Sequence, residues 1–312
     1  MLQSRFTCAH WLSLSLVMLS ACASSASDRK SLTDGTPYDA RANARAAEPI
    51  GVTLSQINIA IEEWNGVILG ARTPEEQRKA SLLEQTIRRD VRERFEDILD
   101  QLNTGPLVNR GIAGAALGFS GEDRALPSLL AALEDPSHAV QRNALLGIGQ
   151  LARPDTPLGG ILAHMRDSID IRIRINAIRA LRLVLEAGAP RDEFRETVIA
   201  DVRRALTDPI PEVRMYSVLI LARLADVESI ESLKILVYDE EMIVASAAGR
   251  ALAFLGDKDP HQKGSCARAL AGALDKVDDN VRSRLIVYLQ QLSRQNWGRE
   301  SEPWIEWAAR LP

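Results

Sequence analysis

The sequence predicts an all-α protein: a right-handed α-α superhelix, with a helical pair before its repeats and a tryptophan-rich cap after them. Three observations predict this fold class. The chain is rich in Ala, Leu, Arg and Glu, and aromatic residues make up only 4% of it, a composition that favours helices over sheets. Apolar residues recur at three- and four-residue intervals, the spacing of one helix face. A unit of two helices joined by a short turn then repeats along most of the 312 residues, as in solenoids.

The first residues form a predicted targeting segment. Arg5 lies in a short polar start, an apolar stretch runs from Trp11 to Leu19, and the string Leu-Ser-Ala-Cys ends at Cys22. This order is typical of an export signal, and the apolar stretch is too short for an ordinary transmembrane helix. Residues 1–21 are therefore interpreted as a signal peptide.

The string that ends at Cys22 resembles the lipobox of bacterial lipoprotein precursors. The resemblance implies cleavage before Cys22, a lipid on its thiol and, because Ala23 follows, sorting to the outer membrane of a Gram-negative bacterium. The periplasmic and surface faces both stay open. An ordinary secretory signal cleaved after Ala23 is the alternative, because Ala21 and Ala23 also satisfy a small-x-small cleavage rule.

Residues 22–50 and 51–103 differ in composition. The first segment is rich in Ser, Ala, Asp and Arg and poor in large apolar residues, which predicts a flexible tether. The second predicts a helical pair, with one helix over residues 54–69 and a long one that begins at Thr73. Thr73, Pro74 and Glu76 have the spacing of a capping box with proline at the first helical position, and an apolar stripe continues from Leu83 to Leu102.

An internal repeat occupies residues 104–295. Its template has an aliphatic residue at position 0, Arg at +1, a small residue at +4 and Leu or Ile at +8, with an Asp five or six residues before position 0. Six copies start at Asn109, Val140, Ile173, Val213, Val244 and Val281. Positions 0, +4 and +8 share one helix face and form a narrow apolar stripe, which we call the seam. A single hairpin cannot bury its seam, whereas stacked neighbouring hairpins can.

This template resembles HEAT repeats, including the HEAT-like repeats of phycobilin lyases. The resemblance implies an α solenoid in which the turn Asp and the +1 Arg form a hydrogen-bonded ladder along the stack. Gln141 and Ala245 stand where two copies would carry that Arg, so the ladder is expected to be interrupted there.

Residues 296–312 concentrate tryptophan. They resemble the Trp-Gly-acidic-x-x-x-Trp-x-x-Trp tail of some bacterial HEAT-like proteins, with Trp297, Trp304 and Trp307 in place. Trp304 and Trp307 lie three residues apart on one helix face, so they can cover the last exposed seam. A ligand-binding aromatic box is the alternative.

No catalytic, cofactor or metal motif is found. The three histidines after the signal, His138, His164 and His261, are widely separated and lack metal-ligand spacing, and phosphate-loop and nucleophile-elbow patterns are missing. Cys266 lies in an apolar helical stretch, as an inert core thiol would. The formal net charge of −4 argues against nucleic acid as a partner. We therefore expect no cofactor and no metal.

Helical geometry points positions +2, +3 and +6 of each second helix away from the seam. We expect these positions to line a partner-binding groove. The candidate groove residues are Arg142, Leu146, Arg179, Met215, Tyr216, Leu219, Arg250 and Arg284. Arginines beside apolar side chains suit a protein or peptide partner. The alternative is that the apolar members simply pack against adjacent hairpins.

Together these features predict a lipid-anchored cell-envelope scaffold for protein interactions rather than an enzyme, attached to the membrane through Cys22. An enzyme acting on a protein substrate, such as a HEAT-like lyase, is the alternative, because a shared fold does not fix function. The export signal argues against a lyase that acts on cytoplasmic antenna proteins.

Overall fold

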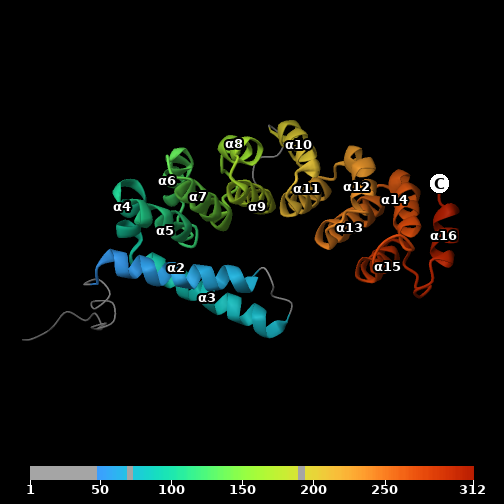
Figure 1. The fold of residues 1–312 in the computed structure, drawn as a ribbon, viewed down its shortest axis with the longest axis horizontal. Helices are drawn as coiled ribbons and strands as arrows, with labels where there is room; N and C mark the ends of the chain where they lie inside the picture. Colours follow the sequence, from blue (N-terminus) through green and yellow to red (C-terminus); the bar gives the residue numbers. More distant parts are fainter. Residues whose placement is uncertain (1–47, 69–72, 189–193) are drawn as a thin grey trace, which may run out of the picture. The chain divides into compact units, whose positions relative to one another are not determined.

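Helices are the regular secondary structure of the described residues, 48–68, 73–188 and 194–312, in the computed structural model of this protein. No strand occurs in these ranges. The helices form successive antiparallel hairpins (Figure 1). The predicted fold class, an all-α superhelix of stacked hairpins, is confirmed.

The N-terminal pair consists of α2 (Ile50–Ile68) and α3 (Pro74–Glu93), which pack along each other. The predicted capping box begins α3: the Thr73 hydroxyl accepts from the Glu76 amide at 3.2 Å, and the Glu76 carboxylate accepts from the Thr73 amide at 2.9 Å. The long helix predicted from Thr73 ends early, because the backbone leaves helical geometry at Arg94, with φ −122° and ψ 25°. The residues beyond form a separate helix, α4 (Phe95–Thr104), which packs mainly on α5.

Six hairpins follow from α4 onward. Their helices are α4 with α5 (Leu107–Leu117), α6 (Ala125–Ala131) with α7 (His138–Leu151), α8 (Gly159–Asp167) with α9 (Ile171–Ala187), α10 (Arg195–Arg204) with α11 (Pro211–Arg223), α12 (Ile230–Leu236) with α13 (Met242–Lys258), and α14 (Pro260–Ala273) with α15 (Asp279–Ser293). Three short 3-10 turns lie beside them: η1 (Ala132–Glu134), η2 (Ala205–Thr207) and η3 (Val227–Ser229). The second helices contact one another in chain order. We call α5, α7, α9, α11, α13 and α15 the second row.

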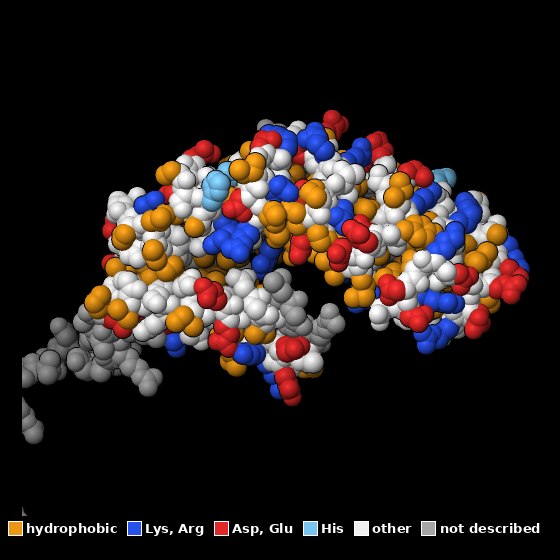
Figure 2. Space-filling view, in the orientation of Figure 1, with side chains coloured by type: hydrophobic (Ala, Val, Ile, Leu, Met, Phe, Trp, Pro, Cys, Tyr) orange, Lys and Arg blue, Asp and Glu red, His pale blue; other side chains and the backbone are white. Residues whose placement is uncertain are grey.

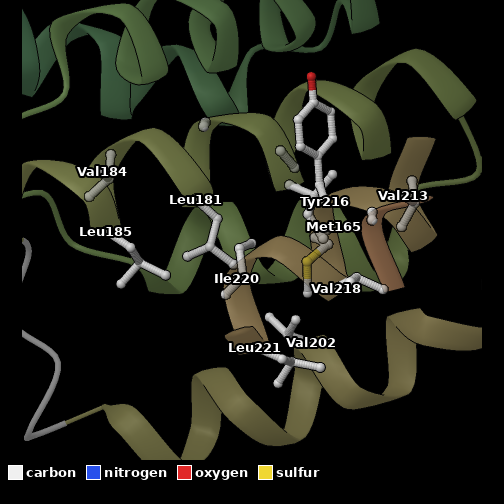
Figure 3. Packing of buried hydrophobic residues seen from close by; sticks show 14 of the residues in the cluster. Met165, Leu181, Val184, Leu185, Val202, Val213, Tyr216, Val218, Ile220 and Leu221 are labelled. Carbon is white, nitrogen blue, oxygen red and sulfur yellow. The ribbon is translucent and has the colours of Figure 1, made fainter. Parts of the chain in front are cut away.

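The repeat template marks the seam between hairpins. In the second copy Val140, Ala144 and Ile148 are fully buried, and the same three positions are buried in the four copies that follow. Asn109, the polar residue at position 0 of the first copy, is only half-buried. Figure 3 shows the result between α8 and α11, where Met165, Leu181, Val202 and Leu221 point into one shared interior. Because each hairpin supplies part of its neighbour's core, the stack has one continuous hydrophobic interior.

Glycines bring α5 and α7 close together. A Cβ at Gly147 would overlap the carbonyl oxygen of Gly114, and a Cβ at Gly118 would overlap the backbone of Gly147. Neither position could accept even alanine without a shift of the two helices. Glycine is therefore required here by packing, although it lowers intrinsic helix propensity.

The expected Asp–Arg ladder forms in every copy that carries the arginine except the last. Three arginines of the second row reach the turn aspartate of the following hairpin: Arg110 to Asp135 at 2.9 Å, Arg174 to Asp208 at 3.3 Å, and Arg214 to Asp239 at 2.7 Å. Gln141 instead donates to the Asp135 carbonyl at 2.8 Å. Arg282, in the last copy, pairs with Asp275 of its own turn at 3.4 Å. The ladder is thus interrupted where Gln141 and Ala245 replace arginine.

The tryptophan-rich end folds into α16 (Glu302–Ala309), which packs on α14. Trp304 is fully buried, and its indole Nε1 donates to the Gly298 carbonyl at 3.1 Å. The rings of Trp297 and Trp304 meet edge to face, with centroids 4.7 Å apart. These contacts agree with the capping interpretation of Trp304, while Trp307 is only half-buried. The cap packs on α14, which is the first helix of the last hairpin, so it does not add a helix to the second row.

The targeting segment, Cys22 and the predicted tether up to residue 47 lie outside the described residues. Within the described ranges, no helix combines the length and the apolar character needed to cross a membrane.

Candidate functional site

The candidate site is the side of the second row that points away from the buried seam. On a helix, position +6 lies nearly opposite the centre of the 0, +4 and +8 arc. In α7, α9, α11 and α13 this position holds Leu146, Arg179, Leu219 and Arg250. We call this surface the second-row face. Apolar and basic residues alternate along it.

The first part of the second-row face is covered by α2, which packs on α5. Four apolar residues of α2 are buried: Leu54, Ile57, Ile61 and Trp64. Trp64 meets Phe119, which follows α5, edge to face with ring centroids 5.1 Å apart. The spacing of three, four and three residues gives α2 one continuous apolar stripe. An amphipathic helix of the chain itself is therefore bound to this face.

Arg179 of α9 lies at the end of the covered part. Its guanidinium carbon is 5.8 Å from the centre of the Trp64 ring, and its Nη1 lies 3.4 Å from the Asn65 Oδ1. Burial lowers the pKa of Arg179, and the nearby charge of Arg182 acts in the same direction. In the part of the chain that the structure describes, no carboxylate lies within ion-pair distance of this guanidinium. The aromatic ring and the amide of α2 are thus its partners.

Beyond Arg179 the face opens into a pocket of about 380 Å³ between α9, α11 and α13. The residues that line it are Arg182, Glu186, Leu219, Ala222, Arg223, Arg250, Ala251 and Phe254. Figure 2 shows apolar side chains exposed over α11 and α13, with charged side chains around them. Phe254 is 42% exposed. We call this surface the α9–α13 pocket.

The arginines of the pocket differ in how they are held. Arg182 pairs with Glu186 at 2.5 Å, and its guanidinium carbon lies 5.5 Å from the centre of the Tyr216 ring. Arg223 donates to the backbone carbonyl of Glu186 at 3.2 Å. Arg250 is exposed, and no acidic partner for it is found among residues 48–68, 73–188 and 194–312. With respect to the described residues, the Arg250 guanidinium is thus available to bind an incoming anion.

The predicted groove residues are divided among several places. Leu219 and Arg250 meet in the α9–α13 pocket. Arg179 lies under α2, and Tyr216 is buried in the core cluster with Arg182 over its ring. The others lie outside the pocket: Arg142, Leu146 and Met215 are half-buried, and Arg284 is exposed. The structure therefore brings together two of the eight residues and leaves the groove prediction itself open.

Six lining residues of the pocket were not predicted: two alanines, Ala222 and Ala251, and four larger residues, Arg182, Glu186, Arg223 and Phe254. The four larger residues occupy positions +9, +10 and +13 of their helices, one or two turns beyond +6. Residues three or four apart share a helix face, so extending the +6 column by one turn would have found Arg182, Arg223 and Phe254.

Two potentially reactive side chains outside the pocket, His164 and Cys266, lie in structural surroundings. The His164 Nε2 lies 2.9 Å from the Leu133 carbonyl oxygen. Burial raises the pKa of Cys266 to about 11, so the thiol is protonated at neutral pH and a poor nucleophile. The described residues contain no group of three or more His, Cys, Asp or Glu side chains placed to hold a metal ion.

Comparison with known proteins supports the repeat architecture. Residues 158–253 match the family model described as HEAT repeats. No curated protein matches the chain. Among solved structures, that of Kap121p bound to RanGTP is similar with a TM-score of 0.53 and 16% identity, covering 78% of this chain and 29% of Kap121p. The matched part thus spans less than a third of the length of the Kap121p chain.

Two engineered proteins are also similar. An engineered protein solved by the Northeast Structural Genomics Consortium has a TM-score of 0.50 and 18% identity, covering 86% of this chain and 76% of its own. A designed armadillo repeat protein has a TM-score of 0.48 and 19% identity, covering 63% of this chain and 98% of its own. At 16–18% identity, the similarity to the two structures with TM-scores of 0.50 and 0.53 shows the fold alone. The chain is an α solenoid, and its residues 158–253 match the family model described as HEAT repeats.

Proposed function

We propose that this protein is a lipid-anchored scaffold of the cell envelope that binds a protein partner on the open part of its second-row face. The α9–α13 pocket carries this proposal. Phe254 and Leu219 supply apolar surface, and Arg250 supplies a charge with no acidic partner in the described residues. Aromatic and arginine side chains are the usual anchors of protein interfaces.

The fold supports binding rather than catalysis. A stack of hairpins presents an extended surface of the kind that solenoid proteins use for binding. Kap121p, which shares the fold, is described in complex with RanGTP. A protein partner is therefore the proposal that best fits a solenoid with an open, mixed surface.

The anchor and the address are parts of the same proposal. The Leu-Ser-Ala-Cys string and the apolar stretch before it support cleavage at Cys22 and lipidation of its thiol. A composition poor in large apolar residues between 22 and 50 supports a tether that holds the solenoid away from the lipid. Ala23 supports outer-membrane sorting by the lipoprotein resemblance.

The scaffold is tested by site-specific crosslinking in the cells that make the protein. A photo-reactive amino acid replaces Phe254 in the pocket or, as the control, Ser232, an exposed residue of α12. We expect one discrete crosslinked protein from position 254 and none from position 232, read by blotting and mass spectrometry. Equal crosslinking from both positions would mean random collision and would reject a specific interface.

The anchor is tested by mass spectrometry of the mature N-terminus. We expect the peptide that starts at Cys22 to carry a diacylglyceryl group and the protein to fractionate with outer membranes. Cys22→Ser should release unprocessed or soluble protein. An unmodified Cys22, or a mature chain that starts after Ala23, would reject the lipid anchor and leave the interface test unaffected.

A further inference from the structure

The internal helix α2 shows what kind of segment the second row accepts. Its apolar stripe is buried, it packs on α3 and α5, and its end reaches Arg179 of α9 through Trp64 and Asn65. Within the described residues, the segment that lies on this face is a helix and not an extended strand. The next arginines along the face, in α9, α11 and α13, belong to the open pocket.

The pocket is basic although the protein is acidic overall. Three arginines and one glutamate line it, a surplus of two positive charges, whereas the formal net charge of the chain is −4. Glu186 already pairs with Arg182, so the remaining charge is carried by Arg223 and Arg250. Opposite charge across an interface raises the association rate and selects the partner. The occupant should therefore be acidic.

The pocket also has an apolar component that a simple polyanion would not use. Leu219, Ala222, Ala251 and Phe254 contribute to its lining, and Val287 of the next helix is 47% exposed. Exposed side chains of this size gain free energy when another apolar surface removes them from water. An occupant that covers them needs an apolar stripe between its charges.

We propose that the α9–α13 pocket binds an amphipathic helix of the partner protein, with an apolar stripe flanked by acidic side chains. This inference rests on the proposed scaffold function and names the chemistry of its partner. Packed helices lie 8–10 Å apart, so the three helices of the pocket span about 20 Å. An α-helix rises 1.5 Å per residue, so about 13 residues suffice to cross it. The bound helix lies on the second-row face as α2 does.

The test uses the full chain in detergent and a fluorescent peptide of about 18 residues, long enough for five helical turns. Leucines take the spacing of Leu54, Ile57, Ile61 and Trp64, and glutamates flank that stripe. Two control peptides have the same composition in shuffled order or lysine in place of glutamate. We expect saturable binding of the striped acidic peptide by anisotropy, at least about tenfold tighter than either control, because it alone matches both charge and stripe.

Charge-reversal variants locate the site. Arg250→Glu and Arg223→Glu should each weaken binding of the striped peptide about tenfold or more. Arg172→Glu is the matched control, because Arg172 is an exposed arginine of the same row that lies outside the pocket. Circular dichroism and the unfolding midpoint show that each variant is folded. Equal weakening by Arg172→Glu and Arg250→Glu would place the peptide elsewhere and overturn the assignment.

The outcomes also separate this inference from the scaffold proposal. Equal binding of the shuffled peptide would indicate a general polyanion site. Tighter binding of a proline-containing extended peptide would indicate recognition of an extended segment. Either result rejects the proposal that the pocket binds an amphipathic helix. A specific crosslink at position 254 together with either result leaves the scaffold standing. If no crosslink forms at position 254 while the striped peptide binds as expected, the pocket chemistry stands and the cellular scaffold is rejected.

Discussion

The two halves of the second row share one repeat but differ in what lies on them. In the first half α2 packs on α5, and Arg179 of α9 lies over the ring of Trp64 at the end of α2. From α11 to α13 the corresponding position holds Leu219 and Arg250, both on the open pocket. Apart from the half-buried Asn109, the seam positions are buried in both halves. The repeat thus specifies stacking, while the residues on the opposite side differ between the part of the face that α2 covers and the part that is open.

The largest expected effect tests whether α2 is an integral part of the covered half. Trp64→Ala removes a side chain that is 3% exposed and packs on Phe119, so we expect a loss of about 3–5 kcal/mol in the free energy of unfolding. Phe254→Ala is the control in the open half, where the ring is 42% exposed, and should cost less than about 1 kcal/mol. Urea unfolding measures both. Similar losses of unfolding free energy in Trp64→Ala and Phe254→Ala would contradict the distinction between the covered and the open half.

Gly147→Ala sharpens the comparison by asking how tightly the covered half is packed. The new Cβ would overlap the Gly114 carbonyl of α5, so α5 and α7 would have to separate, at a cost of about 2–3 kcal/mol. Gly272→Ala in α14 is the control, since a Cβ there meets nothing within 4 Å. That variant should gain up to about 1 kcal/mol from helix propensity. A higher unfolding midpoint for Gly147→Ala than for Gly272→Ala would contradict the close approach of α5 and α7.

The ladder permits a comparison of stability along the stack. Arg214→Ala leaves the Asp239 carboxylate, 7% exposed, with a single backbone partner, and should cost about 2 kcal/mol. Arg110→Ala in the covered half should cost less, about 1 kcal/mol, because the Arg110 side chain is more exposed and better screened. Arg284→Ala, an exposed control, should change nothing measurable. Chemical denaturation of the three variants gives the order, and a larger loss for Arg284→Ala would contradict it.

The smallest effect is the pH dependence of one rung. Burial alone would raise the pKa of Asp135, but the hydrogen bonds from Arg110 and from the Ser137 amide, with the charge of Arg110, hold it below its usual value of 3.8. A carboxyl whose folded pKa is lowered stabilises the fold above its unfolded pKa, and this contribution disappears as pH falls through the folded pKa. Asp135→Asn should therefore be less stable than the parent near pH 6, and the difference should narrow below pH 3.8. A constant difference across that range would show that the carboxylate charge does not matter.

The course of the individual helices shows where sequence reasoning succeeds. The capping box at Thr73 and Glu76 was predicted because both partners lie within one helical turn. The break at Arg94 was not predicted, because the apolar stripe from Leu83 to Leu102 continues through it. Leu219 and Arg250 were predicted as surface residues from helix periodicity. Their neighbours Arg223 and Phe254 were missed because only three positions of each repeat were considered.

The sequence by itself determined the hairpins and the seam, because both depend on spacing within one repeat or between adjacent repeats. The Asp–Arg ladder was expected from the resemblance to HEAT repeats. Only the tertiary structure decided which part of the second-row face is covered. Arg179 contacts Trp64 and Asn65, and Asn65 is 114 residues away in the sequence. The apolar stripe of α2 predicts that this helix packs against another element, but it does not predict which one. Contacts between distant segments depend on which apolar surfaces remain unpaired after the stack has formed.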